Sequence, residues 1–320
     1  MSRIHEALKK AEQERAAAQG GPLQSNFAAT PMSEPAAGEP MVPDAEGAAT
    51  SGAVAPAVST HASTLLSSFS DPFSLDALQA RCATVSWSPD PRAMLFLNGN
   101  DNVPGSEEFR TLRSRLYQIR EKMTLKKILV TSALPKEGKS FTAANLAQVM
   151  VRQHGRRVLL IDADLRGPRL HLMLGTGSAP GLADYLQGKN DEFSIIQRGR
   201  LENLFLIPSG SETSNPAELV ANGRLKFLLQ RLEPLFDWII IDSPPAVPVS
   251  DASLLANSCD GVLMVVRSNA TPVDMARKAR QQFPDKVLVG VVLNGTSGET
   301  GAYSRYYYEA YEKKGTEAKT

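Results

Sequence analysis

The chain has 320 residues, 42% hydrophobic and 22% charged, which fits one large globular domain with additional segments. The formal net charge of +1 argues against the strongly basic surface of nucleic-acid-binding proteins, so no nucleic-acid partner is expected. Only two cysteines occur and no apolar run approaches the ~20 residues that span a bilayer, so a cytoplasmic chain without a disulfide framework is expected.

The first two segments lie ahead of any domain-like pattern. Residues 1–15 predict a short helix, whose apolar positions share one face: Ile4, Leu8 and Ala11. Either a solvated terminus or a docking helix for a partner explains this pattern. Residues 16–72 are dominated by Ala, Pro, Gly and Ser and cannot bury enough apolar surface to offset their ordering entropy. They predict a disordered linker.

The folded domain is expected to span residues 73–296. Its first part, residues 73–105, mixes β-forming residues with Pro89 and Pro91, which is typical of an extended arm lying on a domain. A helix is predicted over residues 106–121, because its apolar residues recur at helical spacing and two glutamates suit its N-terminus.

Short apolar runs then alternate with helical patterns. Strands buried on both faces are predicted at residues 127–131, 158–161, 204–207, 238–241, 262–266 and 287–293. Helices are predicted at residues 140–153, 215–232, 251–257 and 273–282. This alternation predicts an α/β fold with a mainly parallel sheet flanked by helices.

One loop in this pattern has the form that binds phosphate. Ala133 stands where the first glycine is usual, and four residues later the chain reads Gly138-Lys139-Ser140, between an apolar strand and a helix. Backbone N–H groups and a helix N-terminus can offset triphosphate charge, while the lysine reaches the phosphates and the serine ligates Mg²⁺. The sequence therefore predicts a P-loop NTPase fold that binds ATP and Mg²⁺. The loop residues expected to contact the nucleotide are Pro135, Lys136, Glu137, Gly138, Lys139, Ser140 and Phe141.

Two further strands end in acidic residues. One ends in Asp162-x-Asp164-x-Arg166 and another in Asp242-Ser-Pro-Pro. Ligands bind at the C-terminal strand ends of open α/β sheets, so these carboxylates are expected to converge on the P-loop. A single aspartate there would often be only a helix cap, but their common register favours a catalytic site.

With these motifs present, the sequence resembles the bacterial tyrosine kinases (BY-kinases) of capsule and exopolysaccharide systems over about residues 106–311. The Asp162-x-Asp164-x-Arg166 run resembles the family's additional Walker motif, and the Walker B match continues from Asp242 to Asp251-Ala252. The resemblance implies an ATP-dependent protein-tyrosine autokinase that regulates polysaccharide synthesis or export. It also implies a separate transmembrane co-polymerase that activates the kinase and holds it at the inner face of the plasma membrane.

The tail at residues 297–320 carries five of the seven tyrosines of the chain. They crowd into nine residues without helical spacing, which argues against an aromatic stripe packed on the core. A flexible tail is expected after the last strand. The resemblance implies that a neighbouring subunit phosphorylates this cluster, which comprises Tyr303, Tyr306, Tyr307, Tyr308 and Tyr311.

The same resemblance implies roles for single residues. Lys139 is expected to stabilise the transferred phosphoryl group, and Ser140 and Asp242 to hold Mg²⁺. Asp162 is the candidate base and Asp164 the candidate metal ligand, although their roles could be exchanged. Near the adenine, Arg267 and Asn294 are expected, although Asn294 could instead satisfy its own turn.

A final motif concerns assembly. Glu107-x-x-Arg110-x-x-Arg113 resembles the family's oligomerisation motif, which joins domains into a ring; the alternative is a solvated helix face. Two other functions remain alternatives: an ATPase switch of the partitioning or division-site type, and a nucleotide-gated scaffold of a polysaccharide export complex. The first is disfavoured because Leu134 occupies the position of its signature lysine.

Overall fold

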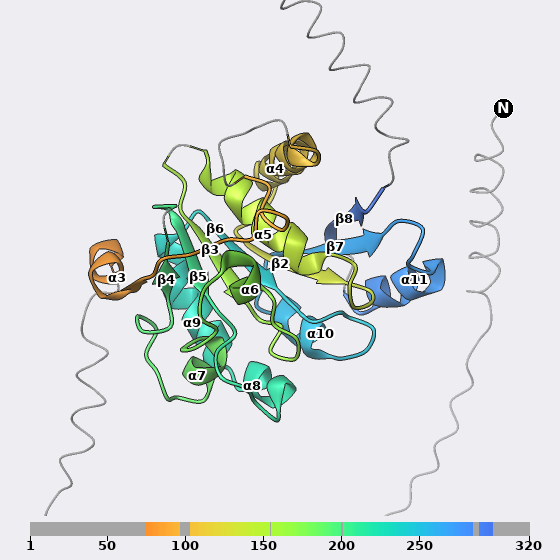
Figure 1. The fold of residues 1–320 in the computed structure, drawn as a ribbon. Helices are drawn as coiled ribbons and strands as arrows, with labels where there is room; N and C mark the ends of the chain where they lie inside the picture. The colour runs from red at the N-terminus through yellow and green to blue at the C-terminus, as the bar shows by residue number, and fades with distance from the viewer. Residues whose placement is uncertain (1–73, 97–102, 154, 200, 284–287, 297–320) are drawn as a thin grey trace, which may run out of the picture. The chain divides into compact units, whose positions relative to one another are not determined.

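A computed structural model describes residues 74–96, 103–153, 155–199, 201–283 and 288–296 (Figure 1). The predicted N-terminal helix at residues 1–15, the linker at 16–72 and the tyrosine tail at 297–320 lie outside these residues. In the part of the chain that is described, no helix combines the length and the apolar character that crossing a membrane requires.

The described residues form an 8-stranded sheet with the order β1-β4-β5-β3-β6-β2-β7-β8 (Figure 1). Its strands are β1 Ala83–Thr84, β2 Lys127–Ser132, β3 Val158–Asp162, β4 Gln197–Arg198, β5 Leu204–Ile207, β6 Trp238–Asp242, β7 Gly261–Arg267 and β8 Leu288–Asn294. Neighbouring strands are parallel, except for the antiparallel pair β4 and β5. The predicted mainly parallel sheet is confirmed.

Helices lie on both faces of this sheet. They are α3 Leu75–Arg81, α4 Ser106–Arg120, α5 Lys139–Val151, α6 Leu170–Leu174, α7 Leu182–Leu186, α8 Pro216–Ala221, α9 Arg224–Leu232, the 3₁₀ turn η1 Glu233–Leu235, α10 Asp251–Ala256 and α11 Val273–Gln281. Four of the predicted helices are confirmed to within two residues. The single helix predicted over residues 215–232 was wrong, because Gly223 adopts φ +81° and separates α8 from α9.

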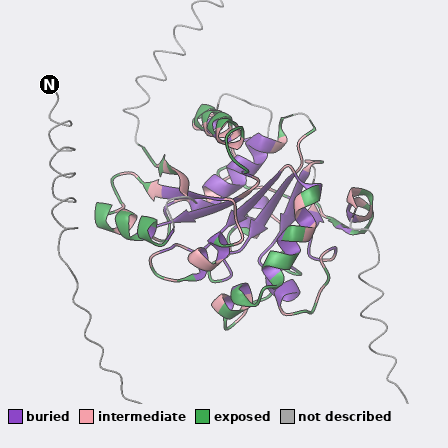
Figure 2. Ribbon diagram, turned by 180° about the vertical axis from the view of Figure 1, so that it is seen from behind, coloured by how far each residue is buried: buried purple, intermediate pink, exposed green. Residues whose placement is uncertain are grey.

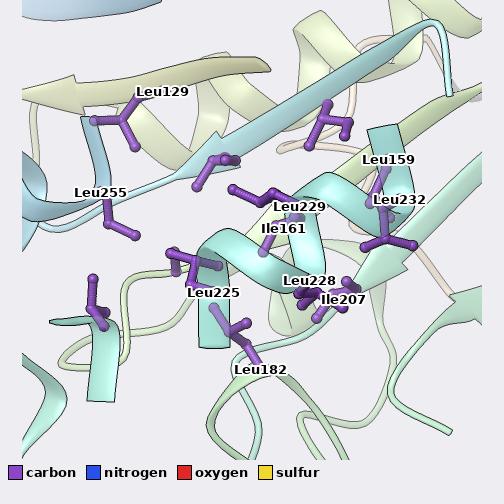
Figure 3. Packing of buried hydrophobic residues seen from close by; sticks show 14 of the residues in the cluster. Leu129, Leu159, Ile161, Leu182, Ile207, Leu225, Leu228, Leu229, Leu232 and Leu255 are labelled. Carbon is purple, nitrogen blue, oxygen red and sulfur yellow. The ribbon is translucent and has the colours of Figure 1, made fainter. Parts of the chain in front are cut away.

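The strands divide the core between their two faces, because successive side chains point to opposite sides of a sheet. Leu129 of β2 and Ile161 of β3 pack with the leucines of α9 on one face (Figure 3). Ile128 and Leu160 pack on the other face against α4, α5 and α6. The inner strands β2, β3, β5 and β6 are therefore buried on both sides, as the purple central ribbons of Figure 2 show.

The last strand differs from its prediction. Residues 287–293 were expected to be buried on both faces, but β8 lies at the edge of the sheet order. Val291 and Leu293 lie on the same face of β8 and are 55% and 57% exposed. No helix among the described residues covers this face, and the apolar pattern alone could not show it.

The predicted extended arm contains a helix that the sequence analysis missed. Ser74 caps α3 by accepting a hydrogen bond from the N–H of Ala77, a signal that the serine could have provided. Further along, Trp87 and Phe96 are buried. The side chain of Asn145 on α5 fastens the arm by bonding the backbone on either side of Met94.

Candidate active site

The predicted phosphate-binding loop connects β2 to α5. Gly138 precedes the helix at φ +97°, and a Cβ on it would lie 2.0 Å from the Nδ2 atom of Asn294. The backbone angle therefore favours glycine, and any other residue would also displace the Asn294 side chain. Since α5 begins at Lys139, the N–H groups of its first turn have no partner within the helix and can bind an anion.

Glu137 fixes the shape of this loop from within. Its side chain is 3% exposed and accepts hydrogen bonds from the N–H of Leu134, at 2.8 Å, and from the hydroxyl of Thr271. The carboxylate of Glu137 is thus engaged inside the protein, and the predicted contact of this residue with the nucleotide stays a prediction. Thr271 was missed, because 134 residues separate it from Glu137 and no local pattern links them.

Arg267 and Asn294 brace the loop from the ends of β7 and β8. The Nη1 atom of Arg267 donates to the carbonyl oxygen of Lys136 at 3.2 Å, and the Nδ2 atom of Asn294 donates to that of Glu137 at 2.9 Å. Both residues thus lie beside the P-loop, where a nucleotide would bind. Their predicted contact with adenine stays a prediction.

The acidic residues converge on the P-loop lysine. Asp162 and Asp242 end the paired strands β3 and β6 directly opposite one another. The Nζ atom of Lys139 lies 2.7 Å from Asp164 Oδ2, 4.0 Å from Asp242 Oδ1 and 3.3 Å from Ser140 Oγ. The expected convergence at one edge of the sheet is therefore present.

This cluster concentrates charge out of contact with water. Asp162 and Asp242 are fully buried, and Asp164 and Lys139 are 4% and 8% exposed. Burial, reinforced by Asp242, raises the pKa of Asp162 to about 8. Burial also raises the pKa of Asp242 to about 6, although Lys139 opposes this increase. Burial by itself lowers the pKa of Lys139, but Asp242 and Asp164 outweigh it and raise the value.

Several buried oxygens of the cluster have no hydrogen-bond partner among the described residues. They are Oδ1 and Oδ2 of Asp242 and Oδ1 of Asp162, whereas Asp162 Oδ2 accepts from the N–H groups of Arg169 and Leu170. Such oxygens fit Mg²⁺, which prefers oxygen ligands. In the described part of the chain no three His, Cys, Asp or Glu side chains are arranged to hold a metal ion. Phosphate oxygens and water would therefore complete the shell, as is usual for Mg²⁺.

Arg166, the last residue of the Asp-x-Asp-x-Arg run, points away from this cluster. It makes a two-fold contact with Asp251 at the start of α10, with Nε–Oδ2 and Nη2–Oδ1 distances of 2.8 and 3.0 Å. Asp251 is buried, so the pair ties the loop after β3 to the loop after β6. This contact gives the arginine of the run a structural role in this chain.

The predicted oligomer motif lies on α4. Glu107 and Arg110 form an ion pair with each other on the surface, whereas Arg113 donates to the carbonyl oxygen of Val149 at 2.9 Å. Arg113 therefore also links α4 to the end of α5. The contacts of all three residues with another subunit remain a prediction.

The two tyrosines in the described residues are poor acceptors. Tyr185 is 4% exposed within the core, and the hydroxyl of Tyr117 accepts a hydrogen bond from Trp238 Nε1. The five tail tyrosines are therefore the remaining candidates within the chain.

Comparison with known proteins agrees with this site. Residues 126–275 match the family model described as an AAA domain. The chain is 36% identical to the tyrosine-protein kinase YwqD of Bacillus subtilis (strain 168) over 205 residues, 63% of this chain and 85% of that protein. It is 32% identical to the tyrosine-protein kinase wzc of Salmonella typhimurium (strain LT2), covering 69% of this chain but only 31% of that longer protein.

A solved structure of a tyrosine kinase domain is also similar to this chain. The kinase domain of the Escherichia coli tyrosine kinase ETK is 28% identical and superposes with a TM-score of 0.56, covering 67% of this chain and 89% of that one. The P-loop NTPase architecture is thus shared with a tyrosine kinase domain.

Proposed function

Because the chain belongs to the family of bacterial tyrosine-protein kinases, we propose that it transfers the γ-phosphoryl group of ATP to tyrosines of its own C-terminal segment. The observation that carries this proposal is the buried cluster of Lys139 and three aspartates at the end of the P-loop. Buried charges of this kind are costly and are retained where chemistry requires them.

The protein groups have distinct tasks in this transfer. The N–H groups at the start of α5 bind the phosphates, and Lys139 leaves Asp164 to neutralise the charge that develops on the transferred group. Asp162 accepts the proton of the incoming phenol, because its Oδ1 atom has no partner among the described residues. The phenol oxygen bonds to the γ-phosphorus, the bond to the β-phosphate oxygen breaks, and ADP leaves.

Mg²⁺ supplies electrophilic stabilisation of the phosphates when it is bound. Asp242 and Ser140 are the residues that would hold it, with Asp164 available once Lys139 has moved to the phosphates. Asp242 is favoured because neither of its carboxylate oxygens has a hydrogen-bond partner among the described residues, and only Lys139, at 4.0 Å, forms an ion pair with it.

The acceptors in this proposal are Tyr303, Tyr306, Tyr307, Tyr308 and Tyr311 of a neighbouring subunit. Mixing two variants of the full chain tests the transfer between subunits. A Lys139→Met chain can only accept phosphate, and a chain with Phe at the five tail tyrosines can only donate it. The Lys139→Met chain is expected to become labelled when the two variants are mixed, but not when it is incubated by itself. If the Lys139→Met chain stays unlabelled in the mixture while wild type labels itself, transfer occurs only within one chain.

We also propose a homo-oligomeric ring held through α4 and released by phosphorylation. Each phosphotyrosine adds about −1.5 to −2 charges, so a modified cluster would be repelled by the acidic site. Size-exclusion chromatography before and after incubation with ATP should show a decrease in size. Arg110→Glu should prevent the larger species from forming, whereas Arg277→Glu on α11 serves as a control of equal charge. An unchanged size in every sample would contradict the ring.

Activity in the cell is proposed to serve exopolysaccharide or capsule synthesis, with a separate transmembrane co-polymerase as activator at the inner face of the membrane. Residues 1–15 are the proposed docking segment and residues 16–72 the tether. Pull-down of the full chain with that membrane protein, compared with a chain lacking residues 1–15, would test the contact.

A further inference from the structure

A pocket of 390 Å³ lies beside the catalytic carboxylates, and neither the motifs nor the comparisons assign a role to it. Its walls come from Leu165 and Arg166, directly after Asp164, and from the loop that follows β5. Its volume falls in the range of about 300–1,000 Å³ that is typical of ligand sites. It is therefore large enough for one amino-acid side chain of the substrate.

The sheet order places this pocket on the acceptor side of the active site. The order β5-β3-β6-β2 puts the P-loop at one end, the aspartates of β6 and β3 next, and the loop after β5 beyond them. A nucleotide on the P-loop has its terminal phosphate near these aspartates. The acceptor must approach from the opposite direction, which is where the pocket lies.

The pocket is lined mostly by polar residues, with two buried apolar residues among them. Leu165 and Pro216 are buried, as is Ser209, whose hydroxyl has no hydrogen-bond partner among the described residues. Ser211 and Ser214 are exposed at the rim. Buried Leu165 and Pro216 together with several serine hydroxyls suit an aromatic ring with a hydroxyl, because both parts of a phenol then find partners.

Charge at the rim distinguishes a phenol from its phosphate ester. Arg166 already forms its two-fold contact with Asp251, so its charge is largely compensated. Glu212 is exposed at the rim and adds a negative charge. A phosphotyrosine, which carries about −1.5 to −2 charges, would be repelled there.

The tail has pairs of tyrosines two residues apart. In an extended peptide, side chains two residues apart point to the same face and lie about 6.6–7 Å apart. Tyr306 and Tyr308 have this spacing, and the neighbouring strands β3 and β5 lie closer together, about 5 Å apart, so two long side chains of one peptide can reach both strand ends. One tyrosine can therefore occupy the catalytic position above β3 while the other enters the pocket beside β5.

We infer that this pocket is an acceptor subsite that takes a second, unmodified tyrosine two residues from the tyrosine being phosphorylated. This inference rests on the proposed kinase function and adds a rule to it. Each phosphorylation removes a preferred neighbour, so the reaction on the cluster limits itself and spreads over several chains. The preference for an unmodified neighbour arises from the pocket between the loops after β3 and β5.

Peptides of residues 300–313 test this rule on the full chain with Phe at its five tail tyrosines. One series keeps Tyr306 as the only acceptor and places Phe, Ala or phosphotyrosine at position 308; the mirror series keeps Tyr308 and varies position 306. In at least one series kcat/KM should fall about tenfold from Phe to Ala, because the ring no longer packs on Leu165 and Pro216. It should fall by a similar or larger factor from Phe to phosphotyrosine. The same changes at position 307, which faces the other way, should have little effect.

Two pocket variants make the test specific. Ser214→Trp should reduce activity on the Phe peptide to that on the Ala peptide, while the affinity for ATP is unchanged. Glu212→Lys should reduce the discrimination against phosphotyrosine at least several-fold. Glu202→Lys, an equal charge change before the other end of β5, should leave it unchanged. If Ser214→Trp fails to fold, the pair Glu212→Lys and Glu202→Lys still decides the question.

The outcomes separate this inference from the kinase function. Equal activity on every peptide, or equal effects of the Glu212 and Glu202 substitutions, would overturn the subsite and leave the kinase in place. Failure to label any peptide, together with failure of wild type to label its own tail, would overturn the kinase function itself.

Discussion

The two edges of the central sheet treat their charges in opposite ways. At the C-terminal edge, three buried aspartates crowd around Lys139 and leave several oxygens without partners among the described residues. At the N-terminal edge, Lys127 bonds both Glu233 and Asp260, at 2.7 and 3.1 Å. Both edges belong to the same strands, so the difference is not one of secondary structure.

The aspartates at the N-terminal edge accept hydrogen bonds that those at the other edge lack. Asp260 Oδ2 accepts from the N–H groups of Lys126 and Lys127, both at 2.8 Å. Asp237 pairs with Arg156 and also accepts from the N–H of Arg157, and these contacts outweigh its burial and lower its pKa. Charges with hydrogen-bond partners thus hold the fold together, whereas buried charges without them mark the place prepared for a ligand.

The largest effect is expected from Lys139→Met. It removes the cation that faces the transferred phosphoryl group, so autophosphorylation measured with radiolabelled ATP should fall by about 1,000-fold or more. Lys127→Met makes the same substitution at the first residue of β2, on the N-terminal edge of the sheet. It should lower the free energy of unfolding while the folded protein keeps its activity. Equal loss of activity in both variants would break the distinction between the edges.

Asp162→Asn should separate activity from stability. Without the proton acceptor, the rate should fall by about 10²–10⁴-fold. Because an amide relieves the crowding against Asp242, the free energy of unfolding without ATP should rise by about 1–2 kcal/mol. Urea denaturation and the labelling assay measure the two quantities. A loss of stability would show that the carboxylate is held favourably after all.

Asp260→Asn should have the reverse effect. The amide cannot form the ion pair with Lys127, and its bonds to two backbone N–H groups become weaker. The free energy of unfolding should fall by about 2 kcal/mol, with activity of the folded protein within about twofold of wild type. A stable but inactive variant would place this residue in the functional machinery.

Asp237→Asn should give the smallest effect, which depends on pH. Its folded pKa lies below the ordinary value of 3.8, so its stabilisation is complete above that value and is lost as pH falls through the folded pKa. The variant should be less stable than wild type by about 1 kcal/mol at neutral pH, since Arg156 is partly exposed. The two proteins should converge below about pH 3. If the difference in free energy of unfolding between the two proteins stays constant with pH, the lowered pKa of Asp237 is not its cause.

The sequence predicted those features that depend on local pattern. Apolar runs gave the inner strands, and Gly138-Lys139-Ser140 located the P-loop, because strand ends and loop chemistry are encoded within a few residues. The convergence of Asp162 with Asp242 followed from the rule that parallel strands end at one edge.

What the sequence could not show depends on contacts between distant residues. The exposed face of β8 follows from the strand order, and the bond between Thr271 and Glu137 joins two loops far apart in the chain. The pocket beside Leu165 needed both the loop after β3 and the loop after β5. The polar run after the strand predicted at residues 204–207 was a visible signal, since it follows a strand end at the ligand-binding edge.

Phosphosite mapping of the purified full chain after incubation with ATP and Mg²⁺ tests the central claim most directly. The C-terminal tyrosine cluster of wild type should carry phosphate, and the Lys139→Met chain incubated alone should carry none. A wild-type chain whose C-terminal tyrosines stay unmodified, or equal modification of the Lys139→Met chain, would contradict the assignment of this P-loop site to tyrosine phosphorylation.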